Sequence, residues 1–217
     1  MSGVAGVNGI AVRTVKGGAS VIQVRGPVLQ SHIAAMQDLT PRGPAGIQWR
    51  SVTIFYEDVL RALDAASIRF VLVGGVAVIL HGVPRTTADL DLVIDLEQDN
   101  ARRFVAVMTQ LGFVPRAPVE AADLASADRR RDWVADKHML AFTFHRPGRP
   151  LDEVDVLIDP PVPFAEMAAG ADLVEAEGLR LPIAGIRHLI RMKEHAGRAQ
   201  DVADVDALRR LLEASGE

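Results

Sequence analysis

Polar residues alternate with small or apolar ones in a short segment near the middle of the chain. They are, in order, Arg85, Thr87, Asp89 and Asp91. Successive side chains of a β-strand point to opposite faces, so a strand here would place all four on one face, about 6–7 Å apart. Neighbouring carboxylates repel each other unless a cation lies between them, and hard oxygen ligands suit Mg²⁺. The spacing therefore predicts a divalent-metal site on this strand.

A glycine pair, Gly74 and Gly75, follows a short apolar stretch and opens a predicted helix. Because glycine has no Cβ, a backbone N–H can approach an anion closely, and the first turn of a helix carries partial positive charge. We expect a phosphate at this pair, beside a metal held by Asp89 and Asp91. An edge strand whose polar face meets water is the alternative, but it does not require the preceding strand, glycine pair and helix.

A third carboxylate, Asp155, lies within the apolar segment 154–158. Burying a charge in such a strand costs several kcal/mol unless the charge is paired or bound to a metal. Asp155 is therefore the candidate third metal ligand. The alternative is a buried ion pair with an arginine such as Arg85.

Hydrophobic periodicity and the positions of glycine and proline indicate the elements around these residues. Helices are predicted over residues 53–66, 76–82, 99–111, 119–135, 184–195 and 201–213, with Asp99 and Asn100 as a helix cap. Strands are predicted over residues 70–73, 86–95, 138–144, 153–158, 172–176 and 179–183. This order indicates a mixed α/β fold.

Residues 1–50 differ from the rest, because they carry eight of the eighteen glycines and show weak periodicity. We expect a weakly ordered N-terminal extension. The alternative is a small β appendage, with a strand over 21–24 and a helical turn over 28–38. Residues 51–217 are expected to form one domain. Its core is predicted at 53–183, and its C-terminal helices at 184–213.

Composition excludes several classes of site. The chain of 217 residues has 24 basic and 28 acidic residues, a net charge of −4, so it has no general attraction to nucleic acid or membranes. The absence of cysteine excludes disulfides, thiolate metal sites and a cysteine nucleophile. No apolar run is long enough to cross a membrane, and no signal peptide is evident, so we expect a cytoplasmic protein. Three arginines at 129–131 could contact tRNA, although a solvated helix face is the favoured interpretation.

Taken together, the motifs resemble the polymerase β-type nucleotidyltransferase superfamily, and within it the AbiEii-like toxin group of small bacterial nucleotidyltransferases. The resemblance covers about residues 53–212. It rests on Gly74-Gly75, His81-Gly82, Arg85-x-Thr87-x-Asp89-x-Asp91, Asp155 and the C-terminal segment 189–208.

The resemblance implies a nucleotidyltransferase fold, with helices packed on a mixed sheet and a helical C-terminal part. It also implies transfer of a nucleoside monophosphate (NMP) from a nucleoside triphosphate (NTP) to an acceptor hydroxyl. The acceptor would be an RNA such as tRNA, a protein or a small molecule. Two Mg²⁺ ions, or Mn²⁺, would be held by the catalytic residues Asp89, Asp91 and Asp155. A toxin role would add a cognate antitoxin as partner.

The nucleotide-binding positions that the resemblance implies are Gly74, Gly75, Arg85, Thr87, Lys193 and Arg198. For Lys193 and Arg198 the alternative is that basic residues near the end of a helix complement its dipole. Two positions depart from the family pattern, with Val76 where many members carry serine and Gln200 where many carry lysine. These departures leave a second function open, a non-catalytic nucleotide- or partner-binding module. A third is an antitoxin-type protein that transfers AMP to a partner's hydroxyl.

Overall fold

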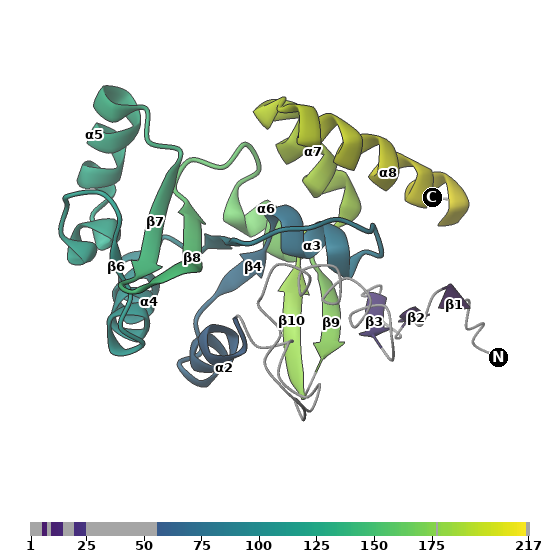
Figure 1. Ribbon diagram of the computed structural model, residues 1–217, viewed down its shortest axis with the longest axis horizontal. Coiled ribbons are helices and arrows are strands. Elements are labelled where there is room, and N and C mark those ends of the chain that lie inside the picture. The colour runs from purple at the N-terminus through teal and green to yellow at the C-terminus, as the bar shows by residue number, and fades with distance from the viewer. Residues whose placement is uncertain (1–5, 8–9, 15–19, 25–55, 177, 216–217) are drawn as a thin grey trace, which may run out of the picture.

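The computed structural model describes residues 6–7, 10–14, 20–24, 56–176 and 178–215 (Figure 1). The strands are β1 (Gly6–Val7), β2 (Ile10–Thr14), β3 (Ser20–Val24), β4 (Phe70–Leu72), β5 (Leu90–Ile94), β6 (Val114–Pro115), β7 (Ala141–Arg146), β8 (Arg149–Leu157), β9 (Asp172–Ala176) and β10 (Leu179–Ile183). The helices are α2 (Glu57–Ala65), α3 (Gly74–Leu80), α4 (Gln98–Gln110), the 3₁₀ helix η2 (Ala121–Ala125), α5 (Ala127–Lys137), α6 (Phe164–Ala169), α7 (Ile186–Ala196) and α8 (Ala199–Ser215).

The described strands form one mixed sheet in the order β1-β2-β3-β9-β10-β4-β5-β8-β7-β6. At its centre β4 pairs with β5 in antiparallel orientation, whereas β5 pairs with β8 and β10 with β4 in parallel orientation. The predicted fold class, a mixed α/β sheet with helices packed on it and a helical C-terminal part, is confirmed (Figure 1).

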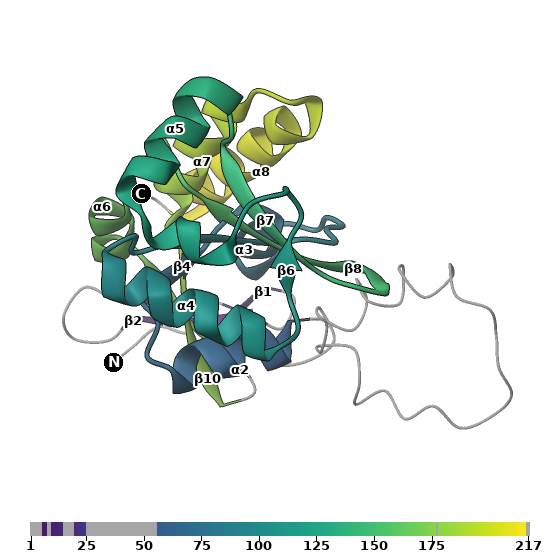
Figure 2. The same ribbon diagram turned by 90° about the vertical axis from the view of Figure 1, so that its left-hand side faces the viewer.

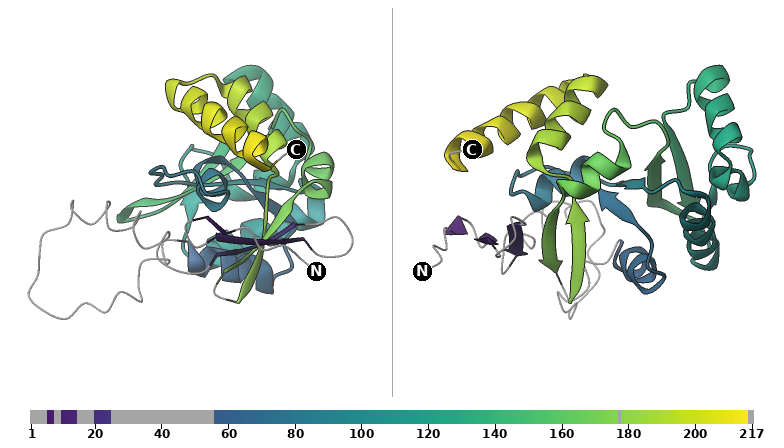
Figure 3. Two further views of the ribbon diagram at one scale, coloured as in Figure 1. Left: turned by 90° about the vertical axis from the view of Figure 1, so that its right-hand side faces the viewer. Right: turned by 180° about the vertical axis from the view of Figure 1, so that it is seen from behind.

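Helices cover one face of the central strands and leave alternate residues on the other. The Trp133 ring of α5 packs on Phe142 of β7 with 5.2 Å between ring centroids, and Phe104 of α4 meets Phe144 edge-on at 5.8 Å. Helices α2 and α4 lie against each other (Figures 1 and 2). Helices α7 and α8 form a separate pair close to α3 (Figures 1 and 3).

Most elements lie close to their predicted positions. The strands on either side of Gly178, β9 and β10, have the predicted bounds, because a glycine with φ of +78° makes the turn between them. Helix α3 begins at Gly74 rather than at residue 76, so the glycine pair is the first turn of the helix.

Three predictions about local structure were wrong. The predicted strand 86–95 is ordered as a strand only from Leu90 to Ile94. The predicted helix 119–135 divides at Ser126, whose side chain accepts the N–H of Arg129 and starts α5. Asn100 is no cap, because α4 begins before it and the buried Asn100 amide donates to the carbonyls of Arg69 and Asp95.

Helix α6 and the short strand β6 were not predicted. The strand predicted at 21–24 lies in β3, which pairs with β9, whereas the helical turn predicted at 28–38 lies outside the described residues. The division of the chain near residue 50 stays a prediction. Within the described part of the chain, no helix is both long and apolar enough to cross a membrane.

Candidate functional site

Strand pairing brings Asp91 and Asp155 together. β5 and β8 are parallel neighbours, and their register sets Asp91 directly beside Asp155. Residues paired in this way project to the same face of a sheet. Their neighbours along the strands, such as Leu90 and Val154, are fully buried on the other face. The two carboxylates therefore lie side by side on the face that the apolar core leaves free.

The glycine pair holds the carboxylate of Asp91. A Cβ on Gly74 would stand 1.9 Å from Asp91 Oδ2, and Gly74 has a φ of +60°, so both space and backbone conformation require glycine here. The backbone N–H of Gly75 donates to the Asp91 carboxylate. A Cβ on Gly75 would lie 2.5 Å from Thr87 Oγ1, so the glycine pair lies against two other predicted site residues, Asp91 and Thr87.

Burial and repulsion between the acids shape the electrostatics of the site. Burial first, and then the charge of Asp155, raise the pKa of Asp91 to about 6 against the opposing hydrogen bond from Gly75. Asp89 adds to the rise. Burial also raises the pKa of Asp155, with Asp89 contributing, although a hydrogen bond from Thr143 lowers it. The three predicted carboxylates are therefore close enough for their charges to repel one another.

Asp155 carries the clearest sign that the site suits a cation. Its Oδ1 atom is buried and has no hydrogen-bond partner among the described residues. The alternative interpretation was an ion pair with an arginine such as Arg85, but Arg85 Nη1 lies 2.5 Å from Asp204 Oδ2 instead. The charge of Arg116 lowers the pKa of Asp155, although the Arg116 side chain forms its ion pair with Glu153. An unpartnered buried carboxylate oxygen beside two other acids is unfavourable unless positive charge is bound there.

The donor set fits Mg²⁺ that is shared with a ligand. Within the described residues, no three acidic, histidine or cysteine side chains are placed to hold an ion by themselves. Mg²⁺ keeps several waters and is usually held by one or two carboxylates together with substrate phosphates, rather than by a cage made only of protein. Asp91 and Asp155, with Asp89 nearby, match such a partial set.

The predicted cations of the C-terminal helices, Lys193 and Arg198, form an ion-pair network with Asp201 and Asp204. Lys193 Nζ lies 2.9 Å from Asp201 Oδ1 and 2.8 Å from Asp204 Oδ2, and only 8% of the Lys193 side chain is exposed. Arg198 Nε lies 2.7 Å from Asp201 Oδ2. Because Arg85 also pairs with Asp204, the network ties α7 and α8 to the segment that leads into β5. The nucleotide-binding roles of Arg85, Lys193 and Arg198 stay predictions.

Tyr56 belongs to the site and was missed, because the segment that contains it was predicted only as part of the helix 53–66. Its hydroxyl donates to the backbone carbonyl of Ala88, next to Asp89. Burial, and then the charge of Asp89, raise the pKa of Tyr56 above its ordinary value. The one available signal was that Tyr56 is the chain's single tyrosine.

Other candidates have structural roles. The Arg130 guanidinium donates to the carbonyls of Leu124 and Leu96, at 2.6 and 3.1 Å. The middle arginine of 129–131 therefore connects α5 to η2 and to the segment after β5. His81 Nε2 lies 2.8 Å from the carbonyl oxygen of Ala184, and burial lowers the pKa of His81.

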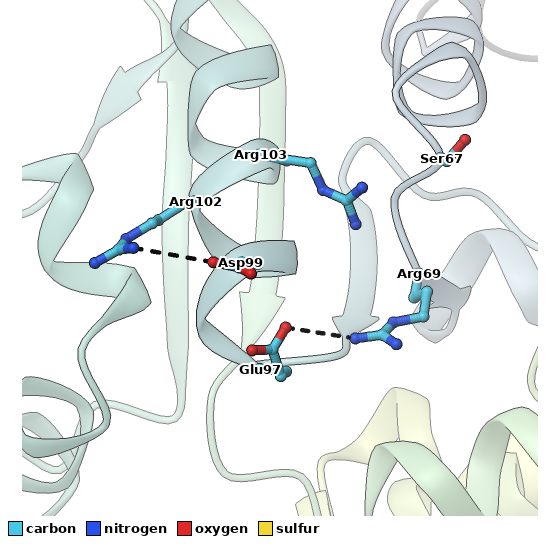
Figure 4. Close-up of a pocket in the computed structure, with 6 residues that line it drawn as sticks. All are labelled: Ser67, Arg69, Glu97, Asp99, Arg102 and Arg103. Atoms are coloured by element: carbon cyan, nitrogen blue, oxygen red, sulfur yellow. Dashed lines mark ion pairs between the residues drawn. The ribbon is translucent and has the colours of Figure 1, made fainter.

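A further hollow has a volume of about 530 Å³, and Figure 4 shows the side chains that line it. It is lined by Ser67, Arg69, Glu97, Asp99, Arg102 and Arg103. Arg69 directly precedes β4 and Glu97 lies in the turn between β5 and α4, whereas Asp91 lies near the other ends of these antiparallel strands. The hollow is therefore separate from the acidic site.

No protein-family model and no curated protein sequence matches the chain. Several solved structures are similar to the chain, and three of them follow. The crystal structure of ANT(2")-Ia with adenylyl-2"-tobramycin has a TM-score of 0.48 and 15% identity over 76% of this chain and 90% of that one. The solution structure of the antibiotic-resistance factor ANT(2'')-Ia has a TM-score of 0.45 and 15% identity over 74% and 82%. An antigenic nucleotidyltransferase-like protein from Paracoccidioides brasiliensis has a TM-score of 0.43 and 18% identity over 70% and 72%. At these scores the likenesses assign neither a family nor an activity to the chain.

Proposed function

We propose that this chain is a metal-dependent nucleotidyltransferase that moves an NMP group from an NTP to an acceptor hydroxyl. The observation that carries the proposal is the placement of Asp91 beside Asp155 on paired strands, with an unpartnered buried oxygen on Asp155 among the described residues. The arrangement agrees with the sequence resemblance to polymerase β-type nucleotidyltransferases, in which acids far apart in the chain act together.

Asp89, Asp91 and Asp155 would hold two Mg²⁺ ions, with Mn²⁺ as a substitute. Bound metal would neutralise charge on the phosphates and on the displaced pyrophosphate. Gly74 fixes the position of one of these ligands, because its missing Cβ is what admits the Asp91 carboxylate. The fold thus holds the Asp91 carboxylate in a fixed position, and catalysis of phosphoryl transfer depends mostly on positioning and charge stabilisation.

Asp155 is the proposed acceptor of the proton from the attacking hydroxyl. Burial raises its pKa, which makes its carboxylate a stronger base, and Thr143 holds it by a hydrogen bond. The bond that forms joins the acceptor oxygen to the α-phosphorus, and the bond that breaks joins this phosphorus to the oxygen that leaves with pyrophosphate.

Arg85, Thr87, Lys193 and Arg198 are the proposed nucleotide contacts, together with the glycine pair. Support comes from their position, since a Cβ on Gly75 would meet both Thr87 and the Arg85 guanidinium. Lys193 also lies close enough to the acids for its charge to lower the pKa of Asp91. Positive charge on this side of the acids suits a triphosphate.

A non-catalytic nucleotide-binding module is the second candidate. It is favoured by the absence, within the described residues, of three side chains already placed to hold an ion, and by Val76 where a hydroxyl is usual. A toxin role with a cognate antitoxin belongs to the first candidate. A toxin would slow cell growth when overexpressed, and co-expression of the neighbouring gene's product would restore growth.

The test is incubation of the protein with Mg²⁺ and each radiolabelled NTP against total RNA, total protein and a small-molecule extract. We expect label in one fraction, and loss of that label in Asp89→Ala, Asp91→Ala and Asp155→Asn variants that remain folded by circular dichroism. Asp159→Asn, which removes an exposed acid just beyond β8, is the matched control and should transfer normally. Transfer that survives in the acid variants, or no label from any NTP, would contradict the proposal.

A further inference from the structure

A second hollow, of about 200 Å³, lies beside the acidic site on the side of β7. It is lined by Arg116, Ala117, Met139, Ala141, Phe142 and Thr143. β7 lies between β6 and β8 in the sheet (Figure 1), and the residues after β6 and before β7 form the walls. The backbone N–H of Arg116 donates to the carbonyl of Thr143 at 2.9 Å, which closes one wall onto the strand.

Thr143 connects this hollow to Asp155. The register of β7 and β8 pairs Thr143 with Asp155, and the Thr143 side chain donates a hydrogen bond to the Asp155 carboxylate. Ala141 lies two residues earlier on β7, so it projects to the same face, while Phe142 and Phe144 enter the core on the other. The hollow therefore opens on the face that bears the acids.

The strand order gives Asp155 two different sides. β8 lies between β5 and β7, so Asp91 stands on one side of Asp155 and Thr143 on the other. If the nucleotide is held on the Asp91 side, then a hydroxyl that gives its proton to Asp155 must approach from the remaining side. That side is the one with the hollow.

We propose that this hollow binds the acceptor, and that the acceptor is an uncharged hydroxyl compound with an apolar body about the size of one amino-acid side chain. This inference rests on the proposed function. The walls offer methyl groups and a thioether, and no carboxylate of the described chain lines them, which disfavours a polycation. The cation in the wall, Arg116, is already paired with Glu153, which disfavours a polyanion such as RNA. The volume lies below the roughly 300–1,000 Å³ of sites for drug-sized ligands.

In the proposed step, the acceptor oxygen forms a bond to the α-phosphorus and its proton passes to the Asp155 carboxylate. Pyrophosphate leaves with the electron pair of the broken phosphorus–oxygen bond. The acceptor's apolar body fills the space between Met139 and Ala141, which points its hydroxyl toward Thr143 and Asp155. Ala141 is thus a specificity residue, because any larger side chain there would occupy the acceptor's place.

The first test is a binding measurement that needs no turnover. The full chain is titrated with p-cresol, a neutral hydroxyl probe, and with spermidine, a polycation, while the Met139 methyl resonance is followed by NMR and assigned with Met139→Leu. We expect p-cresol to shift this resonance and spermidine to leave it unchanged. The shift should be lost in Ala141→Trp and kept in Leu140→Trp, a matched control that puts the same side chain on the adjacent residue, which is 63% exposed and does not line the hollow.

The second test separates this inference from the proposed function. In the labelling assay, Ala141→Trp should still bind the NTP with Mg²⁺ but transfer label at least about tenfold more slowly than Leu140→Trp. Label in the protein fraction or in a neutral small compound supports the inference and distinguishes the two sources of such a hydroxyl. Label in RNA or in a polyamine, unchanged transfer by Ala141→Trp, or no p-cresol shift would overturn it. The dependence of transfer on Asp91 could still stand in each of those cases.

Discussion

Replacing Asp91 by asparagine should stabilise the metal-free protein, and the gain should depend on pH. Burial and the charge of Asp155 raise the pKa of Asp91 from 3.8 to about 6, so the folded state binds this proton more tightly than the unfolded state does. Proton binding by Asp91 therefore stabilises the folded state, with its full effect below about pH 4, and this stabilisation is lost as the pH rises through about 6. Since one pH unit in a pKa corresponds to about 1.4 kcal/mol, the loss amounts to about 3 kcal/mol.

The asparagine side chain would keep the local contacts without the charge, because an amide oxygen can accept the Gly75 N–H and fits the space that Gly74 leaves. We expect Asp91→Asn and the wild type to have similar free energies of unfolding near pH 4, and the variant to be more stable by up to about 3 kcal/mol near pH 8. Urea unfolding in EDTA at a series of pH values measures this difference.

Two further measurements complete that experiment. Asp159→Asn removes an exposed acid near the same sheet and should track the wild type at every pH. Adding Mg²⁺ with an NTP should stabilise the wild type and reverse the order of the two proteins at high pH, because a ligand that binds only the folded state raises its stability. An Asp91→Asn variant that is less stable than the wild type by the same amount at both ends of the pH range would refute the reasoning.

Three other substitutions test the packing of the site by urea unfolding. Gly74→Ala should lower the free energy of unfolding more than Gly148→Ala does. Both glycines have positive φ, but only at Gly74 would the new Cβ collide with a carboxylate. Equal losses of about 1 kcal/mol in the two variants would contradict this contact. Lys193→Met should cost about 3 kcal/mol, because it leaves two buried carboxylates short of a cation, whereas Arg209→Met at an exposed ion pair should cost under about 1 kcal/mol. Tyr56→Phe should cost about 1 kcal/mol through the lost hydrogen bond to a carbonyl, and an unchanged unfolding midpoint would mean that this bond stabilises nothing.

The sequence was a good guide wherever local pattern decides structure. Glycines at 74, 75 and 178 mark two turns correctly, and apolar periodicity places α2, α4, α7 and α8. Alternation along 85–91 was only half informative. Asp91 does lie in β5, but Thr87 packs on Gly75 and Arg85 pairs with Asp204, so these side chains are held by α3 and α8 rather than by a strand ladder.

Long-range contacts set the remaining differences. The helix pattern around Asn100 suggested a cap, yet its amide joins the ends of β4 and β5, which no local rule reveals. Lys193 was predicted to bind nucleotide, with complementing the helix dipole as the alternative, and the sequence did not indicate that the pairing of α7 with α8 buries it between two acids. That β5 and β8 would be parallel neighbours also depends on tertiary structure. The sequence indicated Asp155 as a further metal ligand, because its charge lies within an apolar segment, but it did not predict which strand pairs with β8.

Manganese binding tests the central claim most directly, because it needs no knowledge of the acceptor. Free Mn²⁺ is followed by electron paramagnetic resonance as the protein is titrated with an NTP present. If Asp91 and Asp155 share bound metal, the wild type should remove Mn²⁺ from solution, and Asp91→Asn and Asp155→Asn should each weaken binding by about tenfold or more, while Asp159→Asn should not. Equal Mn²⁺ affinity in all four proteins would contradict the account.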